Sequence, residues 1–147
     1  MRVIIAGGRD LLYGYEPIVA QAIKDSGFDI TEIVCGGAKG IDSIGAAYGD
    51  FNKIPVKYFH ADWNKHGKAA GPIRNLEMAE NADALILVWD GKSAGSSNMK
   101  THAIYHGLKI HEVVVCKHWC DDTDANTSMA EVMGAPRKCS KCRVMYT

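Results

Sequence analysis

Three glycine-rich segments contain the residues of this chain that are best suited to bind an anionic ligand. The first is Gly7-Gly8-Arg9-Asp10, the second runs from residue 36 to residue 42, and the third runs from residue 90 to residue 98. Glycine lets the backbone turn sharply and lets a ligand approach closely. Backbone amides at the start of a helix bind phosphate or another anion. The alternative for any one segment is a plain strand-to-helix turn, because a single glycine-rich turn is weak evidence of binding.

Individual side chains near these segments suit the same ligand. Asp42 either caps a helix or binds a ribose hydroxyl. Arg74 is expected in the first turn of a helix, where a cation meets the unfavourable end of the helix dipole. A phosphate would remove that penalty and accept a bidentate contact; the alternative is a solvated arginine paired with Glu77 or Asp10. Trp63 either stacks on a base or packs on the domain as part of a lid.

The elements that position these residues follow from the apolar pattern. Short apolar runs at 3–6, 31–35, 55–59, 84–89 and 113–116 predict strands. Helical patterns separate the runs. The first helix starts at Pro17 and ends at Gly27, and the second starts near Ile41. Gly71-Pro72 opens the third helix, and the fourth ends near Gly107. The third helix is expected to bury Ile73, Leu76 and Ala79, the fourth carries Met99, Ala103 and Ile104, and Gly45 lets the second approach the sheet. This alternation predicts an α/β fold, doubly wound, with a mainly parallel sheet of about five strands and helices on both faces.

In a parallel sheet, the turns that follow the strands lie together at the carboxyl edge, where open α/β sheets bind ligands. The first, second and fourth of these turns are glycine-rich, which favours one ligand approached by several bare backbones. Charged and hydroxyl side chains at this edge suit a nucleotide better than an apolar metabolite. The predicted ligand-binding residues are Gly7, Gly8, Arg9, Asp10, Gly36, Gly37, Ala38, Gly40, Asp42, Trp63, Arg74, Asn75, Asp90, Gly91, Ser93, Gly95, Ser96, Ser97 and Asn98.

Length and composition limit the function classes. A chain of 147 residues predicts one main domain that buries a real core. With 17 basic and 17 acidic side chains the net charge is zero, which argues against a nucleic-acid-binding protein. No apolar run approaches the roughly 20 residues of a membrane helix, and the N-terminus enters a strand at once, so no signal peptide is expected. We therefore expect a cytoplasmic protein, in the host cytoplasm if it is phage-encoded, whose five cysteines serve as thiols or metal ligands.

The last thirty residues differ from the rest and contain three of the five cysteines, and a fourth, Cys116, lies just before them. We expect residues 1–116 to form the domain and residues 117–147 to form a C-terminal appendage. Cys116, Cys120, Cys139 and Cys142 form two close pairs with the spacing of a structural zinc site. His118 is an alternative to Cys116 as a ligand, and unrelated free thiols are the alternative to zinc. Cys35 lies apart and is expected in the core.

Four motifs in order resemble the SLOG superfamily. They are Gly7-Gly8-Arg9-Asp10, then Gly36 to Asp42, then Ala70 to Met78, and then Asp90 to Gly95. The superfamily joins Smf/DprA proteins, LOG nucleotide hydrolases and small single-domain proteins of bacteria and phages. The likeness covers roughly residues 1–116 and is closest to the small YspA/YpsA-like branch. It implies a Rossmann-like domain that binds nucleotide-derived ligands such as ADP-ribose.

The same resemblance bears on catalysis. LOG hydrolases carry a glutamate after their Pro-Gly-Gly-x-Gly-Thr segment, whereas Ser97, Asn98, Met99 and Lys100 occupy the matching region here. Cleavage of a glycosidic bond needs a carboxyl group; nothing in the sequence shows that Asp42 or Asp90 takes this role. The leading interpretation is therefore a homo-oligomeric protein that senses or sequesters a nucleotide-derived ligand, with no catalytic cofactor. The alternatives are a LOG-type nucleotide N-glycosidase and a DprA-like binder of single-stranded DNA.

Overall fold

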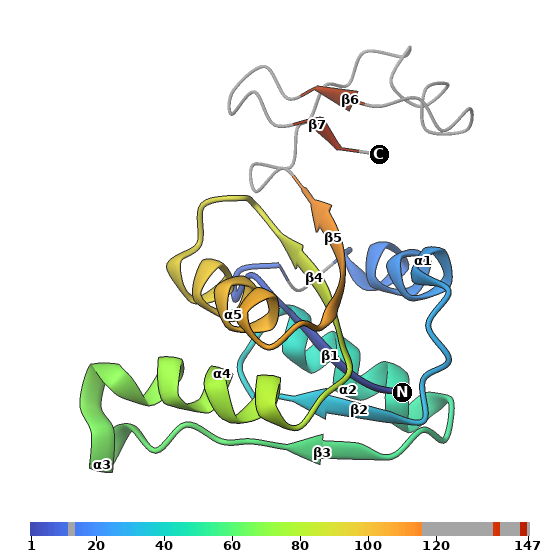
Figure 1. Ribbon diagram of the computed structural model, residues 1–147. Helices are drawn as coiled ribbons and strands as arrows, with labels where there is room; N and C mark the ends of the chain where they lie inside the picture. Colours follow the sequence, from blue (N-terminus) through green and yellow to red (C-terminus); the bar gives the residue numbers. More distant parts are fainter. Residues whose placement is uncertain (12–13, 116–136, 139–144, 147) are drawn as a thin grey trace.

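A five-stranded parallel sheet forms the centre of the protein in its computed structural model, which describes residues 1–11, 14–115, 137–138 and 145–146 (Figure 1). The strands are β1 (Arg2–Gly7), β2 (Glu32–Cys35), β3 (Val56–Tyr58), β4 (Ala84–Trp89) and β5 (Lys109–Val114). They lie in the order β3-β2-β1-β4-β5, and every neighbouring pair is parallel. The predicted doubly wound, Rossmann-like fold is confirmed. The order of connection reverses between β1 and β4, which is where such sheets open a crevice.

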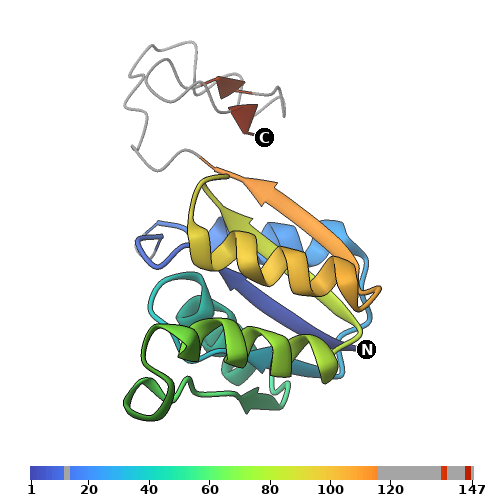
Figure 2. The same cartoon turned by 60° about the vertical axis from the view of Figure 1, so that its left-hand side comes forward.

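Helices cover both faces of the sheet (Figure 2). The helices α1 (Glu16–Ser26) and α2 (Ile41–Phe51) pack on one face, and α4 (Ala70–Glu80) and α5 (Ala94–Tyr105) pack on the other. A short helix α3 (Trp63–His66) and a 3-10 turn η1 (Gly67–Ala69) lie between β3 and α4. Two further strands, β6 (Arg137–Lys138) and β7 (Met145–Tyr146), form an antiparallel pair.

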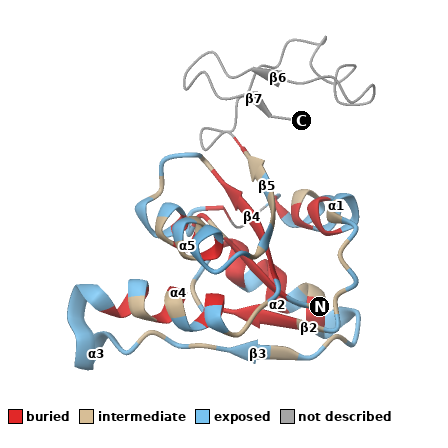
Figure 3. Ribbon diagram, in the orientation of Figure 1, coloured by how far each residue is buried: buried red, intermediate tan, exposed pale blue. Residues whose placement is uncertain are grey.

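The core has two layers because the central strands are buried on both sides. Along β1, Val3 and Ile5 face α1 and α2, whereas Ile4 and Ala6 face α4 and α5. All six residues of β4 are buried (Figure 3), as the longest apolar run of the sequence predicted. A strand with both faces covered needs apolar residues at every position, and this explains the lack of alternation.

Local signals set the ends of the helices. Pro17 lies in the first turn of α1, and Gly27 ends that helix in the left-handed conformation with φ of 67°. Gly45 of α2 lies against β1, because a Cβ atom there would come within 2.7 Å of Cγ2 of Ile5. These three predictions are confirmed.

Two predictions, one about a strand boundary and one about the buried face of a helix, are wrong. β5 begins at Lys109 rather than at Val113, and it is an edge strand paired with β4 alone within the described residues. The buried face of α4 contains Arg74 and Asn75 with Met78 and Ala79, while residues 73 and 76 are half-buried. Ile104 of α5 is 61% exposed.

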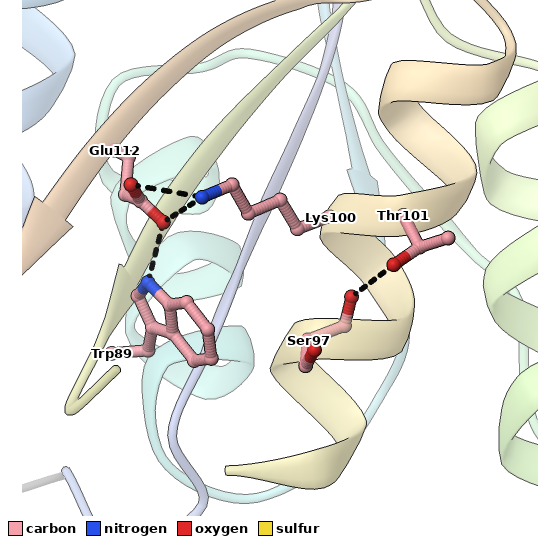
Figure 4. Close-up of polar contacts among 5 residues, drawn as sticks. All are labelled: Trp89, Ser97, Lys100, Thr101 and Glu112. Carbon is pink, nitrogen blue, oxygen red and sulfur yellow. Dashed lines mark hydrogen bonds and ion pairs between the residues drawn. The ribbon is translucent and has the colours of Figure 1, made fainter. Parts of the chain in front are cut away.

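A small polar cluster connects β5 to α5 (Figure 4). The indole Nε1 of Trp89, at the end of β4, donates to Oε2 of Glu112 at 2.8 Å. Nζ of Lys100, on α5, lies 3.0 Å from the same carboxylate oxygen and 5.9 Å from the centre of the indole ring. Trp89 is buried, as expected, and its side chain joins β4, β5 and α5 rather than facing a ligand.

In the part of the chain that the structure describes, no helix has the length and apolar character that crossing a membrane requires.

Candidate functional site

The first two glycine-rich turns lie against one another at the carboxyl edge of the sheet. The amide of Gly8 donates to the carbonyl of Val88 at 3.1 Å, and the amide of Ile41 donates to the carbonyl of Gly8 at 3.3 Å. Gly40 has φ of 80°, and a Cβ atom there would overlap the carbonyl oxygen of Gly8. The turns after β1 and β2 therefore come this close only because residue 40 is glycine.

A cavity of about 400 Å³, here called the main cavity, opens beside these turns and extends to the start of α5. It lies outside the carboxyl ends of β1 and β4, where the order of the strands reverses. Its lining residues come from five parts of the fold: Ala6, Gly7 and Arg9; Ala38 and Asp42; Trp63 and Lys68; Gly71, Pro72, Arg74, Asn75 and Met78; and Ser93, Ala94, Gly95, Ser96, Asn98 and Met99.

Arg74 lies at the inner end of the main cavity and is only 8% exposed. α4 begins at Ala70, so Arg74 is in the second turn rather than in the first turn. Its guanidinium donates to the carbonyl of Gly36 and, through Nε, to Oδ1 of Asn75 at 3.0 Å. Burial lowers the pKa of Arg74, and the negative charge of Asp42 opposes that shift. The alternative of a solvated arginine paired with Glu77 or Asp10 is therefore wrong, because Arg74 is a buried cation.

Asn75 extends this network to the third glycine-rich segment. Its Nδ2 donates to Oδ1 of Asn98 at 3.0 Å and to the carbonyl of Gly95 at 3.3 Å. Adjacent residues of α4 thus hold two different loops, because Arg74 bonds the turn after β2 and Asn75 bonds the start of α5. Arg74 and Asn75 together therefore fix the distance between the turn after β2 and the start of α5, and with it the width of the main cavity.

Asp42 is the one carboxylate among the described residues that line the main cavity, and it is 5% exposed. Burial raises the pKa of Asp42 to about 6, although Arg74, the Ala38 amide and Arg9 all favour the ionised form. Ala38 donates its amide to Oδ2 of Asp42 at 3.4 Å. A carboxyl group with a pKa near neutrality can accept or donate a proton under physiological conditions.

The first turn of α5 forms the opposite wall. Ser93 precedes the helix, no side chain caps it, and its first turn contains no acidic residue. The Oγ atom of Ser96 is fully buried and has no hydrogen-bond partner within the described part of the chain. Helix N-termini leave several amide donors without intrahelical acceptors. The first turn of α5, including Ser96 with its buried hydroxyl, therefore lines the main cavity.

A second cavity, here called the side cavity, adjoins the first and has a volume of about 380 Å³. Arg9, Ala38, Trp63 and Arg74 line both cavities. The guanidinium carbon of Arg9 lies 5.7 Å from the centre of the Trp63 ring, and the other edge of that ring rests near Gly71. Trp63 is half-exposed at the boundary between the cavities.

The structure brings most of the predicted ligand-binding residues to these two cavities. The main cavity contains Gly7, Arg9, Ala38, Asp42, Trp63, Arg74, Asn75, Ser93, Gly95, Ser96 and Asn98, and the side cavity adds Gly36 and Gly37. Six predicted residues line neither cavity: Gly8, Asp10, Gly40, Asp90, Gly91 and Ser97. Among these, Gly8 and Gly40 serve loop packing, and Oδ1 of Asp90 accepts the amides of residues 92 and 93 at 2.8 and 2.9 Å.

Several lining residues were not predicted. Lys68, Pro72 and Met78 line the main cavity, and Lys39 and His60 line the side cavity. His60 follows β3 directly, so the rule that strand ends meet at one edge would have found it. Lys68 offers no such signal, because it belongs to an exposed turn between two helices.

The predicted zinc ligands Cys116, Cys120, Cys139 and Cys142, and the alternative His118, lie outside the described residues. Cys35 is buried in β2, as expected, and burial raises the pKa of its thiol to about 11.

Comparison with known proteins now gives the family. Residues 1–66 match the family described as YspA, cpYpsA-related SLOG. The Gene 61 protein of Mycobacterium phage D29 is 35% identical over 120 aligned residues, which cover 74% of this chain and 93% of the phage protein. No solved structure gives a significant match. The matched segment includes the first two glycine-rich turns, and the phage relative is covered almost throughout. The chain therefore belongs to the YspA, cpYpsA-related SLOG family.

Proposed function

We propose that this protein binds a nucleotide-derived ligand, of the ADP-ribose type, with a phosphate at the start of α5. The observation that carries the proposal is the Oγ atom of Ser96, which is buried in the wall of the main cavity without a partner among the described residues. A buried hydroxyl without a hydrogen bond costs free energy. A phosphate oxygen that accepts from Ser96 and from the first-turn amides removes that cost.

Gly95 supports the same site. It lies in the first turn of α5, and a Cβ atom there would meet nothing within 4 Å. Glycine destabilises a helix by roughly 1 kcal/mol relative to alanine. Packing gives no reason for this cost, whereas the close approach of a ligand to the backbone does.

The polar network supports a nucleotide rather than an apolar compound. Arg74 supplies a fixed positive charge, and Asn75 and Asn98 supply amide groups at the same wall. Because these side chains are held by hydrogen bonds before any ligand arrives, little side-chain entropy is lost on binding.

The test is calorimetric titration with ADP-ribose, cyclic ADP-ribose isomers, NAD and AMP. We expect at least one of them to bind, and Ser96→Ala to weaken it about tenfold through the loss of one charge-assisted hydrogen bond. Gly95→Ala should also weaken binding, because the new methyl group occupies space that the ligand needs. The melting temperature should stay unchanged or rise, because the methyl group contacts no other part of the described chain.

Thr101→Ala is the matched control. It removes a hydroxyl from the same helix, where Oγ1 of Thr101 bonds the carbonyl of Ser97 on an exposed face (Figure 4). The control should keep the wild-type affinity. Absence of binding to every ligand at millimolar concentration would refute the proposal, and so would equal losses in Ser96→Ala and Thr101→Ala.

Asp42 supports a second candidate function, hydrolysis of the N-glycosidic bond of a nucleotide. It supplies a carboxyl group inside the main cavity with its pKa raised to about 6 by burial. Such a group can protonate a leaving base or stabilise the sugar cation. Asn98, which lines the cavity in the region where LOG enzymes carry glutamate, is neutral.

Chromatographic detection of free base from AMP or NAD tests this function. We expect Asp42→Asn to abolish release while calorimetry still detects ligand binding. If the wild type releases no base from ligands that it binds, the protein is a binding protein and this candidate is excluded.

A further inference from the structure

The side cavity differs from the main cavity in charge. Arg9, Lys39, His60 and Arg74 line it, and its described lining contains no aspartate or glutamate. The chain as a whole has equal numbers of acidic and basic side chains, so this concentration of positive charge is local. Asp42 balances Arg74 from the main cavity, but within the described residues Arg9 and Lys39 form no ion pair.

His60 is held in place at the rim of this cavity. Its ring stacks on Tyr58 with a centroid distance of 5.6 Å and an angle of 2° between the planes. Gly37, with φ of 71°, leaves room for the imidazole, because a Cβ atom there would lie 2.7 Å from Nδ1 of His60. Gly37 therefore brings the turn after β2 against a fixed donor from the end of β3.

The two cavities adjoin one another, because Arg9, Ala38, Trp63 and Arg74 belong to both linings. A nucleotide whose phosphate lies at α5 is close to a second pocket that attracts anions. Basic side chains around a pocket whose described lining lacks carboxylates attract a phosphate, and the buried Arg74 adds a charge that water screens less than the exposed ones.

We infer that the side cavity is a second anion subsite, and that the ligand is a nucleotide with a second phosphate group bound by Lys39, His60 and Arg9. This inference rests on the proposed function and adds to it a binding site for a second phosphate, which an ADP-ribose-type ligand carries in its diphosphate. The second phosphate belongs either to a 5′-diphosphate or to a 3′,5′-bisphosphate, since the same donors suit both.

Calorimetry with AMP, ADP and adenosine 3′,5′-bisphosphate at one ionic strength tests the inference. We expect one of the two-phosphate nucleotides to bind at least tenfold more tightly than AMP. In the double variant Lys39→Ala/His60→Ala this ratio of affinities should fall below about threefold. Lys24→Ala removes an exposed lysine from α1 and should keep the wild-type ratio.

The outcomes separate the two proposals. A gain with ADP alone assigns a diphosphate, a gain with the bisphosphate alone assigns a 3′-phosphate, and either supports the subsite. Binding of AMP without any gain from a second phosphate overturns the subsite and leaves the proposed function intact. A gain that persists in the double variant also overturns it, and failure of all three nucleotides to bind overturns both proposals.

Discussion

At the scale of single residues, Asp42 couples the stability of the fold to pH. Its pKa is about 6 in the folded chain against 3.8 for an ordinary aspartate. Between these values the folded chain holds a proton that the unfolded chain releases, so a rise in pH favours unfolding. The stabilisation from Asp42 is complete below about pH 4 and is lost as pH rises through about 6.

Asp42→Asn should remove this dependence. The free energy of unfolding of the wild type, relative to that of the variant, should fall by about 3 kcal/mol between roughly pH 4 and pH 7. Urea unfolding at several pH values measures it. Asp50→Asn changes an exposed carboxylate on the same helix and should follow the wild type. A constant difference between wild type and Asp42→Asn across this range would show that Asp42 titrates normally.

The sequence identified Arg74 and Asn75 but placed them in the wrong surroundings. The sequence pattern predicts that the helix begins at Gly71-Pro72, whereas it begins at Ala70. The residues around them predicted an apolar stripe of Ile73, Leu76 and Ala79, because hydrophobic periodicity ignores polar residues that are buried by pairing. A polar pair on the inner face of a helix becomes visible only when its partners, here the carbonyls of Gly36 and Gly95, are known.

At the scale of elements, the contact between the first two glycine-rich turns holds the carboxyl edge together. Gly40 has φ of 80° and ψ of −129°, and a Cβ atom would overlap the backbone of Gly8 and Arg9. Gly67 has similar angles, 56° and −132°, but a Cβ atom there would meet nothing within 4 Å. The two positions therefore share backbone strain and differ in the contact.

We expect Gly67→Ala to cost about 1–3 kcal/mol from strain alone and Gly40→Ala to cost more, at least about 4 kcal/mol, because the turns must also move apart. Chemical unfolding of both variants measures the difference. Ligand affinity should fall in Gly40→Ala, since the turns position the main cavity. Equal losses of stability in the two variants would show that the contact between the turns is unimportant.

Central elements were predictable from the sequence and peripheral ones were not. β1 and β4 are buried on both faces, so continuous apolar runs marked them well. β5 pairs with β4 alone among the residues that the structure describes, and its polar residues Lys109 and His111 concealed the start of the strand. α3 has four residues, none of them buried, so no hydrophobic period could reveal it.

At the scale of the whole molecule, the order of the strands explains why distant segments meet. The turns after β1 and β4 follow segments about eighty residues apart in sequence, yet these strands are neighbours, with Gly7 opposite Val88. Right-handed crossovers place α2 on one face and α4 with α5 on the other. The glycine-rich turns thus needed only the alternation of strands and helices in order to converge, and this was visible in the sequence.

The cysteines of the C-terminal segment give a prediction about the whole chain that stands on the sequence alone. Two pairs, Cys116 with Cys120 and Cys139 with Cys142, have the spacing of a structural zinc site. A short segment gains folding free energy from a bound metal rather than from a large core. We expect elemental analysis of protein purified without chelators to give about one zinc per chain.

Cys139→Ser/Cys142→Ser should lose the metal and Cys35→Ala should keep it, because Cys35 is buried in β2. Chelation should lower the melting temperature of the wild type; metal-free protein whose melting is unaffected by chelation would leave the four cysteines as free thiols.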